Sequence, residues 1–347
     1  MTRRPSPLTA GPPLETPMRP VGRRTIALVD PRRDGRSLAV DVWYPAMPSD
    51  APRSRYEVFP GVAFDAAWAQ HEPVAHPGEY PLVLFSHGRT GLRMSYSMCC
   101  EALAARGAVV VSADHPGDAL FDWLTGRQSD DRTNEVDRVA DAHLVLHALL
   151  HADPAVPVDI ANAIRHDQVV LAGHSYGAYT AFATAAGARG VEAHPAVRAI
   201  VGFQAYTRTM SDSLLGRVVA PTLLVVSELD TVTPAAVDAD RPWALLRGHP
   251  VWRLDLAGAG HQAISDIALY AELAEHVPDL PQLVRDYLIS TAAGSVGPHA
   301  RPWRTVAAAQ VEATWAFLSI VLGIDPDDGA AAADRLEGTP GLTLRRR

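Results

Sequence analysis

The chain of 347 residues holds 31 basic and 39 acidic residues, which gives a formal net charge of −8 at pH 7. This balance argues against a nucleic-acid partner, because such a partner normally requires a basic face. Hydrophobic residues make up 48% of the chain, enough for a large core, but no uninterrupted run of about 18 apolar residues indicates a membrane span.

The first 22 residues are rich in proline and polar residues, so residues 1–22 are expected to form a flexible leader. This stretch is basic at first but lacks the apolar run that a signal peptide requires. The two cysteines, Cys99 and Cys100, are adjacent, and a disulfide between neighbours would be strained. Without a disulfide framework typical of exported proteins, a cytoplasmic protein is expected.

Residues 24–30 and 37–44 read as two strands separated by a turn around PRRDG, which predicts an antiparallel hairpin. Residues 45–80 are punctuated by proline and are expected to be irregular. From Pro81 onward, apolar strands alternate with helices, a pattern typical of a mostly parallel, twisted α/β sheet covered on both faces. The expected strands span 81–86, 108–113, 168–173, 198–203, 221–226 and 251–256. The expected helices span 94–106, 135–151, 176–187, 235–247 and 304–322.

This alternation of strands and helices predicts one domain over residues 23–323, followed by a loose tail over residues 324–347. The sequence shows no internal repeat that would indicate a solenoid or a propeller.

Residues 173–177 read GHSYG, a G-x-S-x-G pattern centred on Ser175. The pentapeptide alone is weak, because glycine and serine are common residues. Here it joins the expected strand 168–173 to the expected helix 176–187, the context in which such a serine stands on a strained turn as a nucleophile. The sequence therefore predicts that Ser175 is a catalytic nucleophile.

A serine nucleophile needs a base within hydrogen-bond reach and an acid that orients the base. In strand–turn–helix hydrolases these partners follow in the order acid, then histidine. Asp230 comes just after the strand 221–226, and His261 lies in the glycine-rich loop after the strand 251–256. Glu228 is a rival acid two positions earlier, whereas Asp255 lies inside a strand and is interpreted as structural.

Three other histidines, His87, His115 and His174, also lie near expected strand ends. None follows the acid in chain order, so each is interpreted as a residue that shapes a loop through hydrogen bonds. None of these histidines has a helical H-x-x-x-H spacing or a cysteine partner, so no metal is expected.

A tetrahedral intermediate needs backbone N–H groups preorganised around its negative oxygen. In hydrolases whose nucleophile stands on such a strand–turn–helix, one donor is the amide of the residue after the nucleophile. The other donor comes from a loop after an earlier strand. The sequence therefore predicts an oxyanion hole built from the amides of Tyr176 and Arg89. Gly88 and Gly91 would let the Arg89 loop curl toward the site.

Between about Leu38 and Phe317 the chain resembles bacterial α/β-hydrolases of the group that includes platelet-activating-factor acetylhydrolase, dienelactone hydrolase and polyester-cleaving cutinases. The matching stretches are DVWYPA, LFSHGRTGLR, VVSADHPGD, AGHSYGAYTA, PTLLVVSELDTVTP and RLDLAGAGH. In the animal platelet-activating-factor enzymes the acid follows the strand after the nucleophile helix, where this chain has Gln204. The resemblance to the cutinases instead places the acid at Asp230, and it places Tyr206 where they carry a substrate-binding tryptophan.

These residues predict a serine carboxylic ester hydrolase that forms an acyl-enzyme on a small-molecule ester and needs no cofactor. Two segments, 114–134 and 263–303, are expected to form a cap or walls over the pocket, with Trp123 as a substrate contact. A biosynthetic thioesterase or acyltransferase, an inactive binding protein and a homodimer remain open. A dehalogenase is disfavoured because its nucleophile would be aspartate at position 175.

Overall fold

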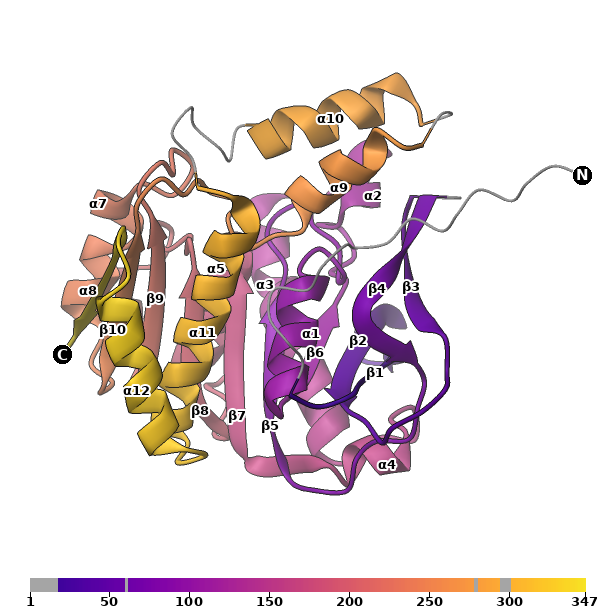
Figure 1. The fold of residues 1–347 in the computed structure, drawn as a ribbon, viewed down its shortest axis with the longest axis horizontal. Coiled ribbons are helices and arrows are strands. Elements are labelled where there is room, and N and C mark those ends of the chain that lie inside the picture. The colour runs from indigo at the N-terminus through magenta and orange to yellow at the C-terminus, as the bar shows by residue number, and fades with distance from the viewer. Residues whose placement is uncertain (1–17, 60–61, 278–279, 294–300) are drawn as a thin grey trace, which may run out of the picture.

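In the part of the chain that the computed structural model describes, residues 18–59, 62–277, 280–293 and 301–347, eleven strands form one sheet (Figure 1). The strands are β1 (Val21–Asp30), β2 (Arg36–Pro45), β3 (Arg53–Phe59), β4 (Val62–His71), β5 (Tyr80–Ser86), β6 (Val109–Ala113), β7 (Ile164–His174), β8 (Val197–Phe203), β9 (Thr222–Ser227), β10 (Val251–Leu256) and β11 (Leu342–Arg346). Their order across the sheet is β11-β10-β9-β8-β7-β5-β6-β2-β1-β4-β3. Strands β5 to β10 run parallel, and β2 and β11 pair antiparallel with their two flanks.

Helices cover both faces of this sheet. They are α1 (Ser97–Arg106), α2 (Leu120–Leu124), α3 (Asp131–Leu150), α4 (Val158–Ala161), α5 (Tyr176–Ala186), α6 (Asp212–Leu215), α7 (Ala235–Asp238), α8 (Asp240–Leu245), α9 (Ile267–Ala274), α10 (Gln282–Ala293), α11 (Trp303–Val321) and α12 (Pro326–Glu337). In Figure 1, α1, α11 and α12 lie in front of the sheet, and α9 and α10 lie above its upper edge.

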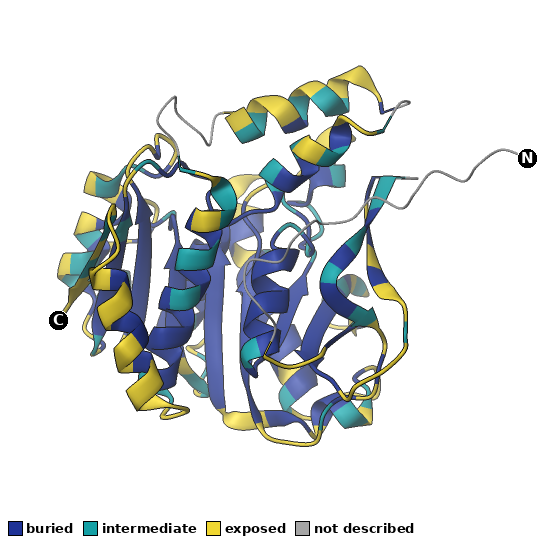
Figure 2. Ribbon diagram, in the orientation of Figure 1, coloured by how far each residue is buried: buried dark blue, intermediate teal, exposed yellow. Residues whose placement is uncertain are grey.

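The parallel strands are apolar throughout because both of their faces are covered. In β5, Val83 and Phe85 join the core on the side of α1 and α11, whereas Leu82 and Leu84 join the core on the side of α3 and α5. Figure 2 shows these central strands as almost wholly buried. The sequence prediction of a mostly parallel sheet with helices on both faces is confirmed, and so is the N-terminal hairpin, in which β1 pairs antiparallel with β2.

Two expectations about the chain outside the central sheet are wrong. Residues 45–80 are not irregular, because β3 and β4 pair there and extend the sheet beyond β1. Residues 324–347 are not loose. Helix α12 buries Leu336 in the core, and β11 pairs with β10 from Trp252 opposite Arg346 to Leu256 opposite Leu342.

The expected leader and helices differ in detail from the structure. Residues 1–17 lie outside the described residues, and β1 begins at Val21, inside the expected leader. The helix expected over 94–106 begins at Ser97, and the helix expected over 235–247 is divided into α7 and α8. Across the described ranges, none of the helices combines the length and hydropathy that a bilayer crossing requires.

A buried glutamate joins β4 to α1. Glu101 on α1 is 1% exposed, and its carboxylate accepts hydrogen bonds from the Tyr56 hydroxyl at 2.7 Å and from the backbone amides of Trp68 and Ala69 at 2.6 and 3.0 Å. These contacts fix β3 and β4 against α1.

Removing this carboxylate should destabilise the fold. We expect Glu101→Ala to lower the free energy of unfolding by about 3 kcal/mol or more, because a buried hydroxyl and two buried amides lose their acceptor. Urea denaturation measures this change, and Glu275→Ala, at an exposed glutamate that follows α9, is the control with an expected effect within about 0.5 kcal/mol. Equal stability of the two variants would contradict the role assigned to Glu101.

Candidate active site

Ser175 stands on a sharp turn between β7 and α5. Its backbone angles are φ 55° and ψ −119°, a left-handed conformation that is strained for any residue other than glycine. Gly173 and Gly177 make the turn sterically feasible. A Cβ on Gly177 would lie 1.9 Å from the carbonyl oxygen of Ser86, and one on Gly173 would lie 2.3 Å from that of Gly177. The turn therefore requires glycine at both positions.

His261 reaches this serine from the loop after β10. Its Nε2 lies 3.0 Å from the Ser175 hydroxyl, and its Nδ1 lies 2.8 Å from a carboxylate oxygen of Asp230. The three side chains come from different strand ends and are between 7% and 8% exposed as whole residues. The structure thus brings the predicted nucleophile, base and acid into one hydrogen-bonded chain.

The Asp230 carboxylate is held by the turn that follows it. One oxygen accepts hydrogen bonds from the amides of Val232 and Thr233, both at 2.8 Å, and the other accepts one from the Thr233 hydroxyl at 2.6 Å. Burial raises the pKa of Asp230, but the hydrogen bonds from His261 and Thr233 outweigh burial and lower it to about 2. Asp230 is therefore ionised at neutral pH and keeps a proton on His261 Nδ1.

The rival carboxylates lie elsewhere. Glu228 is exposed and accepts a hydrogen bond from the amide of Gly258 at 2.8 Å. Asp255 pairs with Arg253 at 2.8 Å. The Gln204 side chain donates to the hydroxyl of Ser227 at 2.9 Å rather than to His261. Of these acidic and amide candidates, only Asp230 contacts the histidine.

His174 links the two loops that flank Ser175. The Gly88 amide donates to the Tyr96 hydroxyl at 3.1 Å, the hydroxyl lies 2.8 Å from His174 Nδ1, and His174 Nε2 lies 2.7 Å from the His261 carbonyl oxygen. Burial and the neighbouring His261 lower the pKa of His174 to about 3, so the ring is neutral. A neutral ring accepts from Tyr96 at Nδ1 and donates to the His261 backbone at Nε2, which holds the histidine loop in place.

Of the two predicted oxyanion donors, Tyr176 directly follows Ser175, and Arg89 lines the same cavity as Ser175. Tyr176 is the first residue of α5, so its amide is one of the helix N–H groups that lack an intrahelical partner. Within the described ranges, neither this amide nor that of Arg89 donates a backbone hydrogen bond outside the helices and strands. The Arg89 side chain pairs with Asp131 at 2.6 Å, and its guanidinium lies 4.7 Å from the centre of the Tyr176 ring.

A cavity of about 400 Å³ opens beside Ser175 and His261. Both expected cap segments contribute to its walls, and the rings of Trp123 and Tyr287 lie 5.5 Å apart between them. The aliphatic and aromatic lining comes from Val58, Leu92, Tyr96, Leu120, Trp123, Val232, Ile267, Tyr270, Tyr287 and Leu288.

Tyr206 does not line this cavity, so the expected substrate contact of Tyr206 does not fit the structure. Its ring instead packs 5.6 Å from that of Tyr176, and its amide donates to the Ser175 carbonyl at 3.0 Å. Tyr206 thus supports the serine turn from outside the cavity.

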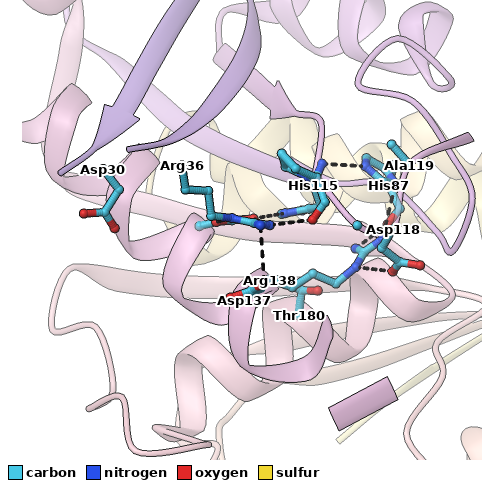
Figure 3. A network of polar contacts seen from close by, with 12 residues as sticks. Asp30, Arg36, His87, His115, Asp118, Ala119, Asp137, Arg138 and Thr180 are labelled. Atoms are coloured by element: carbon cyan, nitrogen blue, oxygen red, sulfur yellow. Dashed lines mark hydrogen bonds and ion pairs between the residues drawn. The ribbon is translucent and has the colours of Figure 1, made fainter. Parts of the chain in front are cut away.

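His87 and His115 are also absent from the cavity lining, and both are buried. Figure 3 shows them side by side, joined by a hydrogen bond. Burial lowers the pKa of both rings, most strongly that of His87, so both are neutral. This placement fits their interpretation as loop-shaping residues. In the described ranges, no group of three or more His, Cys, Asp or Glu side chains is arranged to hold a metal ion.

Two residues that contact the site are absent from the sequence predictions. Thr233 binds Asp230 through both its amide and its hydroxyl, and the D-x-x-T spacing is a signal that was available in the sequence. Tyr96, whose hydroxyl joins Gly88 to His174, lies eight residues after Gly88 and carries no local pattern that identifies it.

Two comparisons with known proteins bear on this arrangement. A family model described as platelet-activating factor acetylhydrolase, isoform II matches residues 57–140, which include β5, the Arg89 loop and half of α3. The solved structure of a ferulic acid esterase from Streptomyces cinnamoneus matches with a TM-score of 0.69 and 22% sequence identity. The match covers 90% of this chain and 93% of that chain.

The ionised Asp230 should make stability depend on pH in the acid range. Its pKa of about 2 in the folded chain lies below the ordinary 3.8, so its contribution is full above about pH 5 and is lost as the pH falls through 2. We expect the stability advantage of the wild type over Asp230→Asn to shrink by about 2 kcal/mol between pH 5 and pH 2. Urea titrations at both pH values measure it, and a constant difference would contradict the assigned charge state.

Proposed function

We propose that this chain, which has the α/β-hydrolase fold, is a serine hydrolase of carboxylic esters. The observation that carries the proposal is the hydrogen-bonded chain from Ser175 through His261 to Asp230, with distances of 3.0 and 2.8 Å, on a strained turn. The family-model match and the similarity to an esterase structure support the same reaction class.

In the proposed reaction, Ser175 Oγ attacks the ester carbonyl carbon while His261 Nε2 takes the hydroxyl proton. The carbonyl oxygen becomes negative and is stabilised by the amides of Arg89 and Tyr176. His261 then protonates the leaving alcohol, and an acyl-enzyme remains on Ser175. Water repeats the sequence with His261 as base, which releases the acid and regenerates the serine.

Asp230 orients the imidazole and stabilises its positive form during each transfer. Because its pKa is about 2, it stays ionised while His261 takes up and releases the proton. The buried hydrogen bonds from Thr233 keep the carboxylate in the plane where it can accept from His261 Nδ1.

The cavity supports an uncharged acyl group as substrate. Its walls next to Ser175 are mainly aliphatic and aromatic, and Arg89, the cation at its rim, is already paired with Asp131. A volume of about 400 Å³ lies at the low end of the range for small-molecule sites. We therefore propose short- to medium-chain or aromatic acyl esters as the substrate class.

Substitutions of Ser175 and Asp230 should separate the roles of the hydrogen-bonded side chains. Ser175→Ala should abolish turnover of p-nitrophenyl butyrate with the fold retained, and Asp230→Asn should lower kcat by about 10³- to 10⁴-fold because the imidazole loses its oriented tautomer. Steady-state kinetics with circular dichroism as the folding check measure both.

Glu228→Gln is the matched control, because it neutralises an exposed carboxylate two residues from Asp230. Its kcat should stay within about twofold of the wild type. A larger loss in Glu228→Gln than in Asp230→Asn would reassign the acid, and full activity of Ser175→Ala would overturn the mechanism.

The cap walls should determine acyl-chain selectivity. Trp123→Ala removes an aromatic wall of the cavity, so its kcat/KM profile over p-nitrophenyl acetate, butyrate, octanoate and laurate should shift toward longer chains. Leu124→Ala is the control, because Leu124 is the next residue on α2 and does not line the cavity. An identical profile in both variants would place acyl binding elsewhere.

A further inference from the structure

We propose that Arg138 is a positioning residue that aims the Arg89 amide into the oxyanion hole. Arg138 lies on α3 and its side chain is 0% exposed, so its guanidinium has no contact with solvent. It does not line the cavity, so it has no contact with substrate there. Figure 3 shows its side chain bound to Asp118. The inference rests on the proposed ester hydrolysis.

The guanidinium holds the backbone of the loop at two successive carbonyl groups. Arg138 Nη1 donates to the His87 carbonyl oxygen at 2.8 Å, and Nη2 donates to the Gly88 carbonyl oxygen at 3.3 Å. A third contact comes from Nε, which donates to the Asp118 carboxylate at 2.7 Å. A planar fork with donors in three directions suits this task, whereas the single ammonium of a lysine cannot fill all three positions.

The Gly88 carbonyl has a direct geometric consequence for Arg89. The Gly88 oxygen and the Arg89 N–H belong to the same planar peptide unit, and in a trans peptide they point in opposite directions. An anchor that draws the oxygen toward α3 therefore turns the N–H away from α3, toward the cavity that Gly88, Arg89 and Ser175 line together.

Two further donors converge on the same oxygen. The Gly91 amide lies 3.1 Å from the Gly88 oxygen, and His87 Nδ1 lies 2.7 Å from it. The His115 amide donates to His87 Nε2 at 3.3 Å, which leaves the proton of the neutral ring on Nδ1. With Arg138 as the charged donor, the peptide unit is polarised and its N–H becomes a stronger donor to a negative oxygen.

The second oxyanion donor is tied to the same arginine. The Arg138 guanidinium carbon lies 5.2 Å from the centre of the Tyr176 ring, within reach of a cation–π interaction. Tyr176 carries the amide at the start of α5, so Arg138 contacts both segments that supply donors. The Asp118 carboxylate compensates the buried positive charge of Arg138. The backbone carbonyl oxygen of Asp118 also accepts a hydrogen bond from the Thr90 amide at 3.2 Å.

A role in positioning predicts a specific kinetic effect. Arg138→Gln should lower kcat for p-nitrophenyl butyrate by about 10- to 100-fold, below the 10²- to 10³-fold loss of a whole oxyanion donor, because the misdirected amide still exists. KM should stay within about threefold, since Arg138 contacts no substrate. Arg138→Lys, which keeps the charge but supplies fewer aimed donors, should fall between Gln and the wild type.

The experiment uses the full chain and counts competent sites by exhaustive labelling with a fluorophosphonate, so that kcat is expressed per folded site. The inhibition constant of phenylboronic acid, whose tetrahedral adduct mimics the transition state, should rise in Arg138→Gln by about the same factor as kcat/KM falls. Arg23→Gln is the matched control, because Arg23 is also buried and ion-paired, with Asp41 at 2.7 Å, and should keep the wild-type kcat.

Three results would overturn the positioning role of Arg138. A kcat within twofold of the wild type in Arg138→Gln, an equal loss in Arg23→Gln, or a loss confined to KM overturns the positioning role. If Arg138→Gln does not fold, Arg138→Lys decides, and failure of both to fold assigns Arg138 to the fold alone and overturns the proposal. Absence of Ser175-dependent turnover in the wild type instead overturns the proposed function, and this inference with it.

Discussion

The close approach of α5 to the end of β5 is the constraint on which the rest of the site depends. Gly177 lies so near the Ser86 carbonyl that a single added carbon would overlap it, and Gly173 meets the first turn of the same helix. This contact holds Ser175 at the carboxyl end of β7, where its backbone adopts a positive φ. It also places the first amide of α5, which has no intrahelical partner, beside the loop that leaves β5.

Around this contact, buried polar groups hold the loops that meet at the serine. The chain of hydrogen bonds from Gly88 through Tyr96 and His174 to the His261 backbone spans the site on one side. The Arg138 guanidinium holds the loop after β5 from the other side. Because neutral histidines and a paired arginine satisfy these buried groups, they fix loop positions without adding an unpaired charge.

The central sheet and the three reacting side chains could be predicted from the sequence because each left a local pattern. Continuous apolar strands, the GHSYG turn and the strand-end positions of Asp230 and His261 are all short-range signals. The outer strands were missed although RSRYEVF alternates between buried and exposed residues, because the prolines around it suggested loops. Helix α12 was missed although Asp325 caps it and Pro326 follows the cap.

The supporting residues could not be predicted in this way. Arg138 lies 50 residues from Gly88 in the sequence, and Tyr96 lies 78 residues from His174, so only the folded topology brings each pair together. The wrong placement of Tyr206 has the same origin. A position carried over from a resemblance gives the loop but not the direction of the ring, which here packs on Tyr176.

The proposed function depends on the reactivity of Ser175, which covalent labelling measures. The purified chain is treated with a fluorophosphonate, its ester turnover is followed, and the labelled site is located by peptide mass spectrometry. We expect one phosphonyl group per chain on the peptide that carries Ser175, with turnover lost in proportion to labelling. Ester turnover that persists with Ser175 unlabelled, or stoichiometric labelling of another residue, would contradict it.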